Sequence, residues 1–450
     1  MRITTLETLL QHDIGTAGRP LSRAAIESYQ AEALYQLVEY CRLGSPFYRS
    51  KLAEFDNQTI SGLDGLSALP LTSETELREQ GHHMLCVSQD EVARIISLPS
   101  SGTTGAAKRL FFTEDDLERT RLFFRIGMGN LAEPGQKAAI LLPGATPDST
   151  GYLLAGALQA MDVSSEILGL VSDPVAVARQ LVAGRFDVLI GFPIQLLAVA
   201  RVAEARKMEL PMIRSVLLCS DYIPKSVSTA LAASFGCEVF SHYGTVESGL
   251  GGAVDCAMHC GMHIRETDLL IEIIDPKTGY PLADGRWGEI VLTTLRRRAM
   301  PLVRYQTGDL GRLLVGTCPC GSTIRRLDKV KGRIFLQRKL RSGAWIDLPT
   351  LDEVLFDLPG LIDFSAAIDE NAGQDRLCLT LQCLPGHEDA TVETAGRLLA
   401  GQPQLCGVHV QVEHDSGYRR LHQGKRQLFD QREFVCYETA CSSSLLNPCR

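Results

Sequence analysis

The sequence lacks both a long apolar run and a concentrated basic region. No window approaches the roughly 18 uncharged apolar residues that a membrane-spanning helix needs. The formal net charge is -8, and the one dense basic run, Arg296 to Arg298, is short. We therefore expect neither a nucleic acid nor a membrane as partner, because each requires a basic face or an apolar span.

We expect no signal peptide either, because the stretch from Met1 to Gly15 carries charges inside its only apolar segment. The 14 cysteines are scattered through core-like segments and do not form the pattern of a disulfide framework. We expect a cytoplasmic protein with reduced thiols. Any cysteines that do cluster should then be considered first as metal ligands.

The composition and the order of apolar segments predict an α/β fold with more than one domain. At 450 residues, 45% hydrophobic and 22% charged, the chain is a globular protein of enzyme size. From about residue 92, apolar runs such as "FDVLIGFP" and "SVLLCSD" alternate with helical segments, which is typical of buried parallel strands. We predict a large N-terminal domain over 1–333 with mixed or parallel sheets flanked by helices, including a β-rich subdomain at about 268–333. A small α+β C-terminal domain would cover 334–450.

The loop "SSGTTGAAK" is rich in glycine and hydroxyl residues and ends in Lys108. Gly102 and Lys108 have the separation of a Walker A motif, but Ala107 and Arg109 replace its second glycine and its Ser/Thr. The flanking runs are strand-like, and the next helix is expected only near Thr113. The loop therefore joins two strands, either as a phosphate cradle or as a solvated hairpin turn.

Further motifs follow in order along the chain. In "SHYGTVESG", Glu247 follows an apolar run and is suited to hold magnesium on a nucleotide, and Tyr243 is suited to stack or hydrogen-bond at the base. Asp309 in "YQTGDLGR" is a candidate for the ribose hydroxyls, "KGR" offers Arg333, and "GKRQLF" offers Lys425. Taken singly, each residue is better explained by a structural role, such as a strand-end turn with a solvated glutamate.

Together, these motifs resemble the adenylate-forming superfamily, and most closely its phenylacetate–CoA ligase and coenzyme F390 synthetase-like branch. The stretches "SPFYRSKL", "LPLTSETELRE" and "CPCG" also fit that branch, and the resemblance runs from about residue 35 to 435. It implies that ATP activates a carboxylic acid, aromatic or otherwise apolar, as an acyl-adenylate with release of pyrophosphate. The acyl group then passes to a thiol, usually that of coenzyme A.

The resemblance also implies roles for individual residues. The triphosphate would be held by Ser101, Gly102, Thr103, Thr104, Gly105 and Lys108. The adenine would be walled by Ser220, Asp221, Tyr222, Tyr243, Gly244 and Thr245. Glu247 would bind magnesium, Asp309 the ribose, Arg333 the ribose or phosphate, and Lys425 would stabilise charge on the α-phosphate. Candidate walls of the acid pocket are Tyr152, Gly191, Phe192 and Pro193, for which plain core packing is the alternative.

Members of this branch carry a zinc ion in the region of "DCAMHCGMH" and "GTCPCGS". We expect a structural zinc site made by Cys256, His259, Cys318 and Cys320. Cys260 and His263 are the alternates, and free buried thiols are the competing interpretation.

One departure from the pattern leaves the acceptor open. Members that make thioesters commonly show an acidic pair directly after the "GR" of the hinge, where this chain has Ile334 and Phe335. Coenzyme A is the expected acceptor, and an amine or a carrier-protein thiol is the first alternative. The second alternative is a non-catalytic nucleotide-binding relative. A homodimer and a downstream acyl-acceptor protein stay open as partners.

Overall fold

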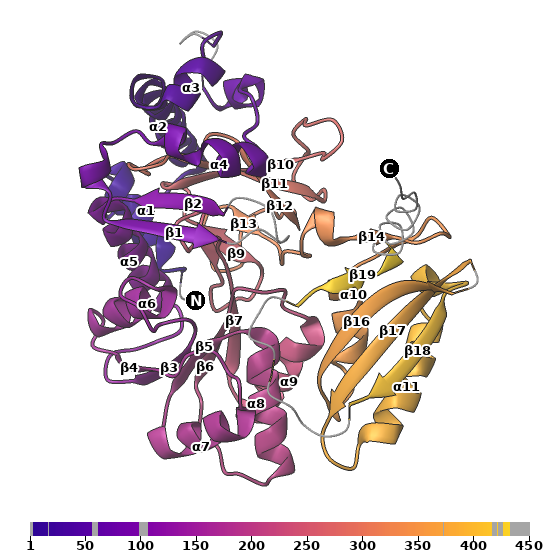
Figure 1. Ribbon diagram of the computed structural model, residues 1–450. Helices are drawn as coiled ribbons and strands as arrows, with labels where there is room; N and C mark the ends of the chain where they lie inside the picture. Colours follow the sequence, from indigo (N-terminus) through magenta and orange to yellow (C-terminus); the bar gives the residue numbers. More distant parts are fainter. Residues whose placement is uncertain are drawn as a thin grey trace, which may run out of the picture.

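The chain folds around a central mixed sheet, with a small antiparallel sheet on one side and a C-terminal sheet on the other (Figure 1). The computed structural model describes residues 3–16, 18–55, 62–98, 107–371, 373–415, 421 and 426–432. In these ranges, no helix has the length and apolar character needed to cross a lipid bilayer. The α/β fold class predicted from the sequence is confirmed.

The central sheet has the strand order β13-β9-β8-β7-β6-β5-β3-β4. Strands β3 to β7 run parallel, and β8, β9 and β13 extend the sheet in antiparallel fashion. The parallel strands are β3 (Lys137–Leu141), β4 (Ser164–Ile167), β5 (Val188–Gly191), β6 (Ser215–Leu218) and β7 (Glu238–Tyr243). The antiparallel strands are β8 (Ala253–Val254), β9 (Met262–Ile264) and β13 (Arg326–Leu327).

Helices cover both faces of the parallel strands, which explains why these strands are apolar without interruption. Successive residues point to opposite faces, so that Leu189 belongs to one core and Ile190 to the other. The core around Leu189 contains side chains from α7 (Pro174–Gly184), α8 (Pro193–Ala205) and α9 (Lys225–Phe235). The core around Ile190 contains side chains from α1 (Leu6–Ile14), α5 (Glu114–Met128) and α6 (Thr150–Gln159).

The N-terminal helices pack on the antiparallel sheet. Helix α2 spans Arg23–Gly44 as its apolar periodicity predicts, and the Ser22 side chain caps its first turn. It is followed by α3 (Pro46–Lys51) and α4 (Glu74–Gln80). The sheet consists of β10 (Leu269–Ile274), β11 (Gly288–Thr294) and β12 (Tyr305–Gly311), and it shares a core with α2 and α3.

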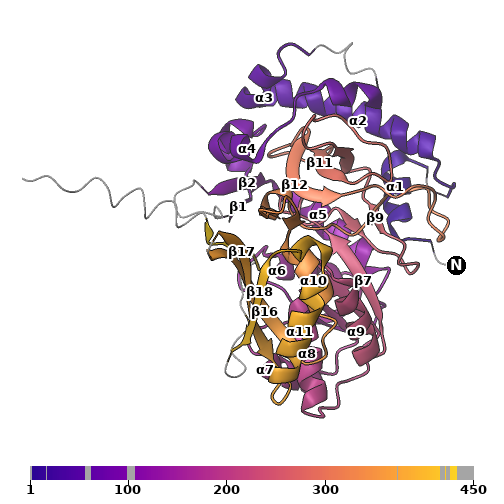
Figure 2. The same cartoon turned by 90° about the vertical axis from the view of Figure 1, so that its right-hand side faces the viewer.

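The C-terminal sheet has the order β18-β17-β16-β19 and lies beside α8 (Figures 1 and 2). Its strands are β16 (Leu361–Asn371), β17 (Gln374–Cys383), β18 (His409–His414) and β19 (Leu428–Asp430). The other elements of this region are β14 (Arg338–Lys339), β15 (Trp345–Ile346), α10 (Leu348–Leu355) and α11 (Glu388–Ala400). Side chains that precede residue 333 in the sequence and side chains that follow it pack in one hydrophobic core. Packing is therefore continuous across the domain boundary predicted there, and that boundary stays a prediction.

Candidate active site

The glycine-rich loop connects two antiparallel strands, as the sequence predicts. Strand β1 (Arg94–Leu98) pairs with β2 (Lys108–Phe112), and Leu98 lies opposite Lys108. Helix α5 begins only after Thr113, whose hydroxyl accepts a hydrogen bond from the Asp116 backbone N–H at 3.2 Å. The loop is therefore not a P-loop. The predicted phosphate-binding residues 101–105, and Lys425, lie outside the described residues.

Lys108 is brought to Glu247 although the two are distant in sequence. The Lys108 ammonium contacts the Glu247 carboxylate closely and lies 3.3 Å from Glu74 Oε1. Tyr305 donates a hydrogen bond of 3.2 Å to the same Glu247 oxygen. Burial by itself would raise the pKa of Glu247, but the charge of Lys108 and its hydrogen bond outweigh burial and lower that pKa below its ordinary value. Glu247 is thus a buried, ionised carboxylate.

Asp309 contacts two more of the predicted site residues, Arg333 and Tyr243. Its backbone forms an antiparallel bridge with Arg333, and the Arg333 Nε lies 3.3 Å from Asp309 Oδ1. The Tyr243 hydroxyl donates a hydrogen bond of 2.9 Å to Asp309 Oδ2. Burial, together with this carboxylate, raises the pKa of Tyr243 well above its ordinary value, so its proton stays on the phenol oxygen. One positive charge and one neutral hydrogen-bond donor therefore converge on this carboxylate.

The other predicted adenine-wall residues separate into two groups. Ser220, Gly244 and Thr245 line the same cavity as Glu247 and Arg333. Asp221 is exposed. The Tyr222 hydroxyl donates a hydrogen bond of 2.6 Å to Glu353 on α10, which ties this loop to the C-terminal region.

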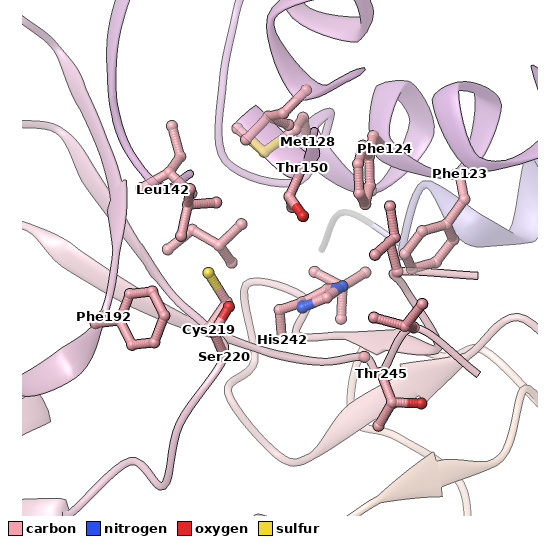
Figure 3. A pocket seen from close by; sticks show the side chains of 18 of the residues that line it. Phe123, Phe124, Met128, Leu142, Thr150, Phe192, Cys219, Ser220, His242 and Thr245 are labelled. Carbon is pink, nitrogen blue, oxygen red and sulfur yellow. The ribbon is translucent and has the colours of Figure 1, made fainter. Parts of the chain in front are cut away.

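The cavity has a volume of about 270 Å³ and opens beyond the carboxyl ends of β3, β5, β6 and β7 (Figure 3). Ligand sites in parallel sheets lie at this edge. Of the proposed acid-pocket walls, only Phe192 lines it, and Tyr152 is 49% exposed. Its lining is mainly apolar and includes Phe123, Phe124, Met128, Leu142, Leu154, Ile190, Phe192, Leu217 and Val254.

Sequence reasoning missed the residues that α5 and the end of β7 contribute to this cavity. Phe123, Phe124 and Met128 read as the apolar stripe of an amphipathic helix, and nothing in that stripe marks a ligand site. His242 carried a usable signal, because it lies two residues before Gly244 in the motif that closes β7. Burial, together with the positive charge of Arg265, lowers the pKa of His242 to about 4. The imidazole is therefore neutral at pH 7.

A separate cluster of cysteine and histidine side chains begins shortly after the motif that contains Glu247 in the sequence. Cys256, His263, Cys318 and Cys320 each offer one ligand atom, and these atoms all lie within 4.8 Å of one another. The Sγ atoms of Cys256 and Cys318 are 3.7 Å apart, and Cys320 Sγ is 3.5 Å from His263 Nε2. Sulfur and imidazole donors in a closed, buried set suit a tetrahedral zinc ion.

The histidine of this cluster is the alternate, His263, and not His259. His259 Nδ1 lies 3.9 Å from Asp255 Oδ2, and its ring packs edge-on against Phe240 at 4.7 Å between centroids. The other alternate, Cys260, is exposed. The three cysteines of the predicted set are therefore brought together as expected, and the expected histidine is not.

Comparison with known proteins yields relatives of one kind. The chain is 33% identical over 359 residues to a phenylacetate-coenzyme A ligase of Thermus thermophilus, which covers 76% of this chain and 78% of that protein. It is 28% identical over 337 residues to the phenylacetate-coenzyme A ligase of Escherichia coli, with 70% and 73% covered. No protein-family model matches the chain.

Among solved structures, a 2-hydroxyisobutyryl-CoA ligase in its postadenylation state with 2-HIB-AMP aligns with a TM-score of 0.79 at 19% identity, covering 94% of each chain. The same ligase with 2-HIB-AMP and CoA in the thioesterification state aligns with a TM-score of 0.65 at the same coverage. These likenesses concern the fold.

Proposed function

This chain belongs to the phenylacetate–coenzyme A ligase family, and we propose that its cavity binds the carboxylic acid which the enzyme activates. The family reaction is ATP-dependent activation of an acid, followed by transfer of the acyl group to coenzyme A. One observation carries the assignment to this site: an apolar cavity lies directly beside Glu247 and Arg333, so an acid and a nucleotide can meet there.

We propose that the nucleotide occupies the charged end of the site. Asp309 would accept hydrogen bonds from the ribose hydroxyls, because Tyr243 and Arg333 already hold its carboxylate in place. Arg333 would contact the ribose or a phosphate. By resemblance, the loop residues 101–105 would hold the triphosphate, and Lys425 would stabilise charge on the α-phosphate.

Glu247 fits a magnesium ion because it is a buried carboxylate that is already ionised. Magnesium would neutralise phosphate charge when it is bound with ATP. The Lys108 ammonium now lies against the Glu247 carboxylate. It would have to move away from this carboxylate when ATP and its magnesium ion bind. Released from Glu247, Lys108 would pair with the phosphates of the triphosphate.

The chemistry needs positioning more than it needs a side-chain nucleophile. A carboxylate oxygen of the acid attacks the α-phosphorus of ATP, and the bond to pyrophosphate breaks. A thiolate sulfur of coenzyme A then attacks the acyl carbon, and AMP leaves. Cations placed where negative charge gathers accelerate such steps, and we assign this role to Lys108 and Arg333, and to Lys425 in the adenylation step.

We further propose that Cys256, His263, Cys318 and Cys320 hold a structural zinc ion. Such an ion would tie the segment that follows Glu247 to the turn before β13. The site lies apart from the cavity, so the ion would support the fold and not take part in acyl transfer.

The region after residue 333 would supply Lys425 for adenylation and then reorient for the thiol step. In the present arrangement, Arg201 of α8 donates hydrogen bonds to the carbonyls of Leu361 and of Phe356, the latter at 2.6 Å. Because Arg201 is buried, breaking these contacts would cost free energy. Arg201 would therefore favour the present arrangement.

Pyrophosphate release over a panel of aromatic and aliphatic acids, with and without coenzyme A, tests this proposal. Release that requires an acid, with an acyl thioester formed when coenzyme A is added, is the expected result. Release without thioester formation would assign the acyl group to an amine or a carrier-protein thiol. Absence of release with every acid would contradict the proposal and favour a non-catalytic relative.

A further inference from the structure

Arg426 is a largely buried arginine to which the proposed reaction assigns no role. Its Nη1 donates a hydrogen bond of 2.7 Å to Asp352 Oδ1 on α10, and its Nε lies 3.0 Å from Asp363 Oδ1 on β16. The guanidinium carbon lies over the rings of Phe356 and Phe364, 5.0 and 4.4 Å from their centroids. Only 11% of the side chain is exposed. The guanidinium is therefore held from several directions.

Stability alone does not explain this cluster. Asp352 and Asp363 are both buried, so two carboxylates and one guanidinium are largely removed from water. Buried ion pairs contribute little stability compared with apolar packing, because desolvation offsets their attraction. Such a cluster does provide a fixed geometry, since a planar guanidinium bound to two carboxylates has few orientations open to it. The cluster is therefore better explained by what Arg426 positions.

Arg426 directly follows Lys425, the residue that would stabilise charge on the α-phosphate. Consecutive Cα atoms are about 3.8 Å apart, so a fixed Arg426 restricts the point from which the lysine side chain starts. On the other side of Arg426, β19 begins at Leu428, which pairs with Ala366 of β16. The chain that leaves Lys425 is thus held first by the Arg426 side chain and then by a strand.

The helix that binds Arg426 also contacts a loop of the cavity. Asp352 lies on α10, and its neighbour Glu353 accepts the hydrogen bond of 2.6 Å from Tyr222. Tyr222 comes two residues after Ser220, which lines the cavity. In the present arrangement, α10 therefore connects the contacts of Arg426 to the place where the acid and the nucleotide would meet.

We propose, resting on the function proposed above, that Arg426 is a positioning residue for adenylation: by binding Asp352 and Asp363, it directs Lys425 toward the α-phosphate. Arg426 itself would touch neither the acid nor the nucleotide, because the two aspartates already bind its guanidinium. Arg426 and both aspartates lie after residue 333, so they would move together when this region reorients for the thiol step. Loss of Arg426 should therefore slow adenylation and leave thioester formation unchanged.

Separate assays of the two half-reactions test the proposal. The parent enzyme is first assayed for pyrophosphate release with a panel of aromatic and aliphatic acids. With an acid that is activated, adenylation is followed as pyrophosphate release in a single turnover at varied ATP. Thioester formation is followed from the synthetic acyl-adenylate of that acid and coenzyme A.

For Arg426→Gln, we expect the maximal rate of adenylation to fall by about tenfold to a hundredfold, because a small misplacement of a catalytic group has an effect of that size. The ATP concentration that gives half of the maximal rate should change little, and thioester formation should proceed as in the parent. Arg426→Lys keeps the positive charge but lacks the planar fork that binds two carboxylates, so it should recover part of the lost rate.

Arg432→Gln is the matched control. Arg432 also pairs with two aspartates of this region, with Nη1 2.8 Å from Asp375 Oδ1 and Nη2 2.6 Å from Asp430 Oδ2. It is not adjacent to Lys425 in the sequence. Arg432→Gln should therefore leave the adenylation rate unchanged, even if it lowers the melting temperature.

The proposal would be overturned by a folded Arg426→Gln variant that adenylates as fast as the parent. Equal losses in both half-reactions, or the same loss of adenylation in Arg432→Gln, would also overturn it, since the ion pairs would then serve only the fold. If Arg426→Gln does not fold, Arg426→Lys is judged by the same outcomes. A parent enzyme that releases no pyrophosphate with any acid is a different result, which contradicts the proposed function and with it the role of Arg426.

Discussion

The Lys108 ammonium lies against the Glu247 carboxylate, and both side chains are almost completely buried. Tyr305 donates a further hydrogen bond to the same carboxylate, so Glu247 is held ionised in a place that water hardly reaches. A buried ion pair of this kind gains little stability compared with apolar packing, because both charges must be desolvated. Because Glu247 also lines the cavity, the pair is better explained by function, since one partner can be exchanged for a metal ion.

Replacing Glu247 with glutamine should remove the proposed magnesium ligand while keeping the side-chain volume. We expect pyrophosphate release to fall by about a hundredfold or more, because loss of one charge-stabilising group in an active site typically has an effect of that size. The measurement is the rate of release as a function of magnesium concentration. Glu74→Gln is the control, since Glu74 contacts Lys108 but is partly exposed. An unchanged magnesium dependence in Glu247→Gln would contradict the assigned role.

Tyr243→Phe should weaken nucleotide binding by removing the hydrogen bond that holds Asp309. A hydrogen bond to a charged group contributes about 1.5 to 3 kcal/mol, so we expect the KM for ATP to rise by about tenfold or more. Steady-state kinetics with varied ATP measures the effect. Tyr280→Phe serves as the control, because Tyr280 is 74% exposed. A KM for ATP that stays the same would show that Asp309 needs no help from Tyr243.

Much of the fold was predictable because its elements follow local rules. Helix α2 follows the helical spacing of its apolar residues, and the start of α5 was predicted from the capping residue Thr113. The loop before Lys108 was correctly placed between strands, because "RLFF" is a strand-like run and the next helix begins only after Thr113.

The failures concern contacts that depend on strand pairing. His259 was the expected zinc ligand, with His263 as an alternate. His259 adopts a left-handed backbone conformation with φ 47°, and its ring turns toward Asp255. His263 instead lies on β9, which pairs with β13 opposite Arg326, and this pairing brings it to the two cysteines that precede β13. Spacing along the chain does not reveal such a register.

The two histidines offer a direct test of the zinc proposal. His263→Ala should lower the zinc content of the purified protein and reduce its melting temperature, because a structural metal site contributes to folding. His259→Ala should retain the zinc, since His259 lies outside the cluster. Metal analysis and thermal unfolding of both variants provide the measurement. Zinc that is absent from the parent protein, or lost equally in both variants, would contradict the proposed ligand set.

His242 also predicts how stability depends on pH. Its pKa is about 4 in the folded chain, against about 6.5 for a free histidine, so the unfolded chain binds the proton more tightly. Stability must then fall as the pH is lowered from 6.5 toward 4, and this residue should account for about 2 kcal/mol between pH 7 and pH 5. His242→Phe should flatten the dependence in that window, whereas His409→Gln, at an exposed position on β18, should not. The measurement is the free energy of unfolding in denaturant at both pH values. The same slope in His242→Phe and in the parent would mean that the buried imidazole keeps an ordinary pKa, and that a positive charge is tolerated in the acid cavity.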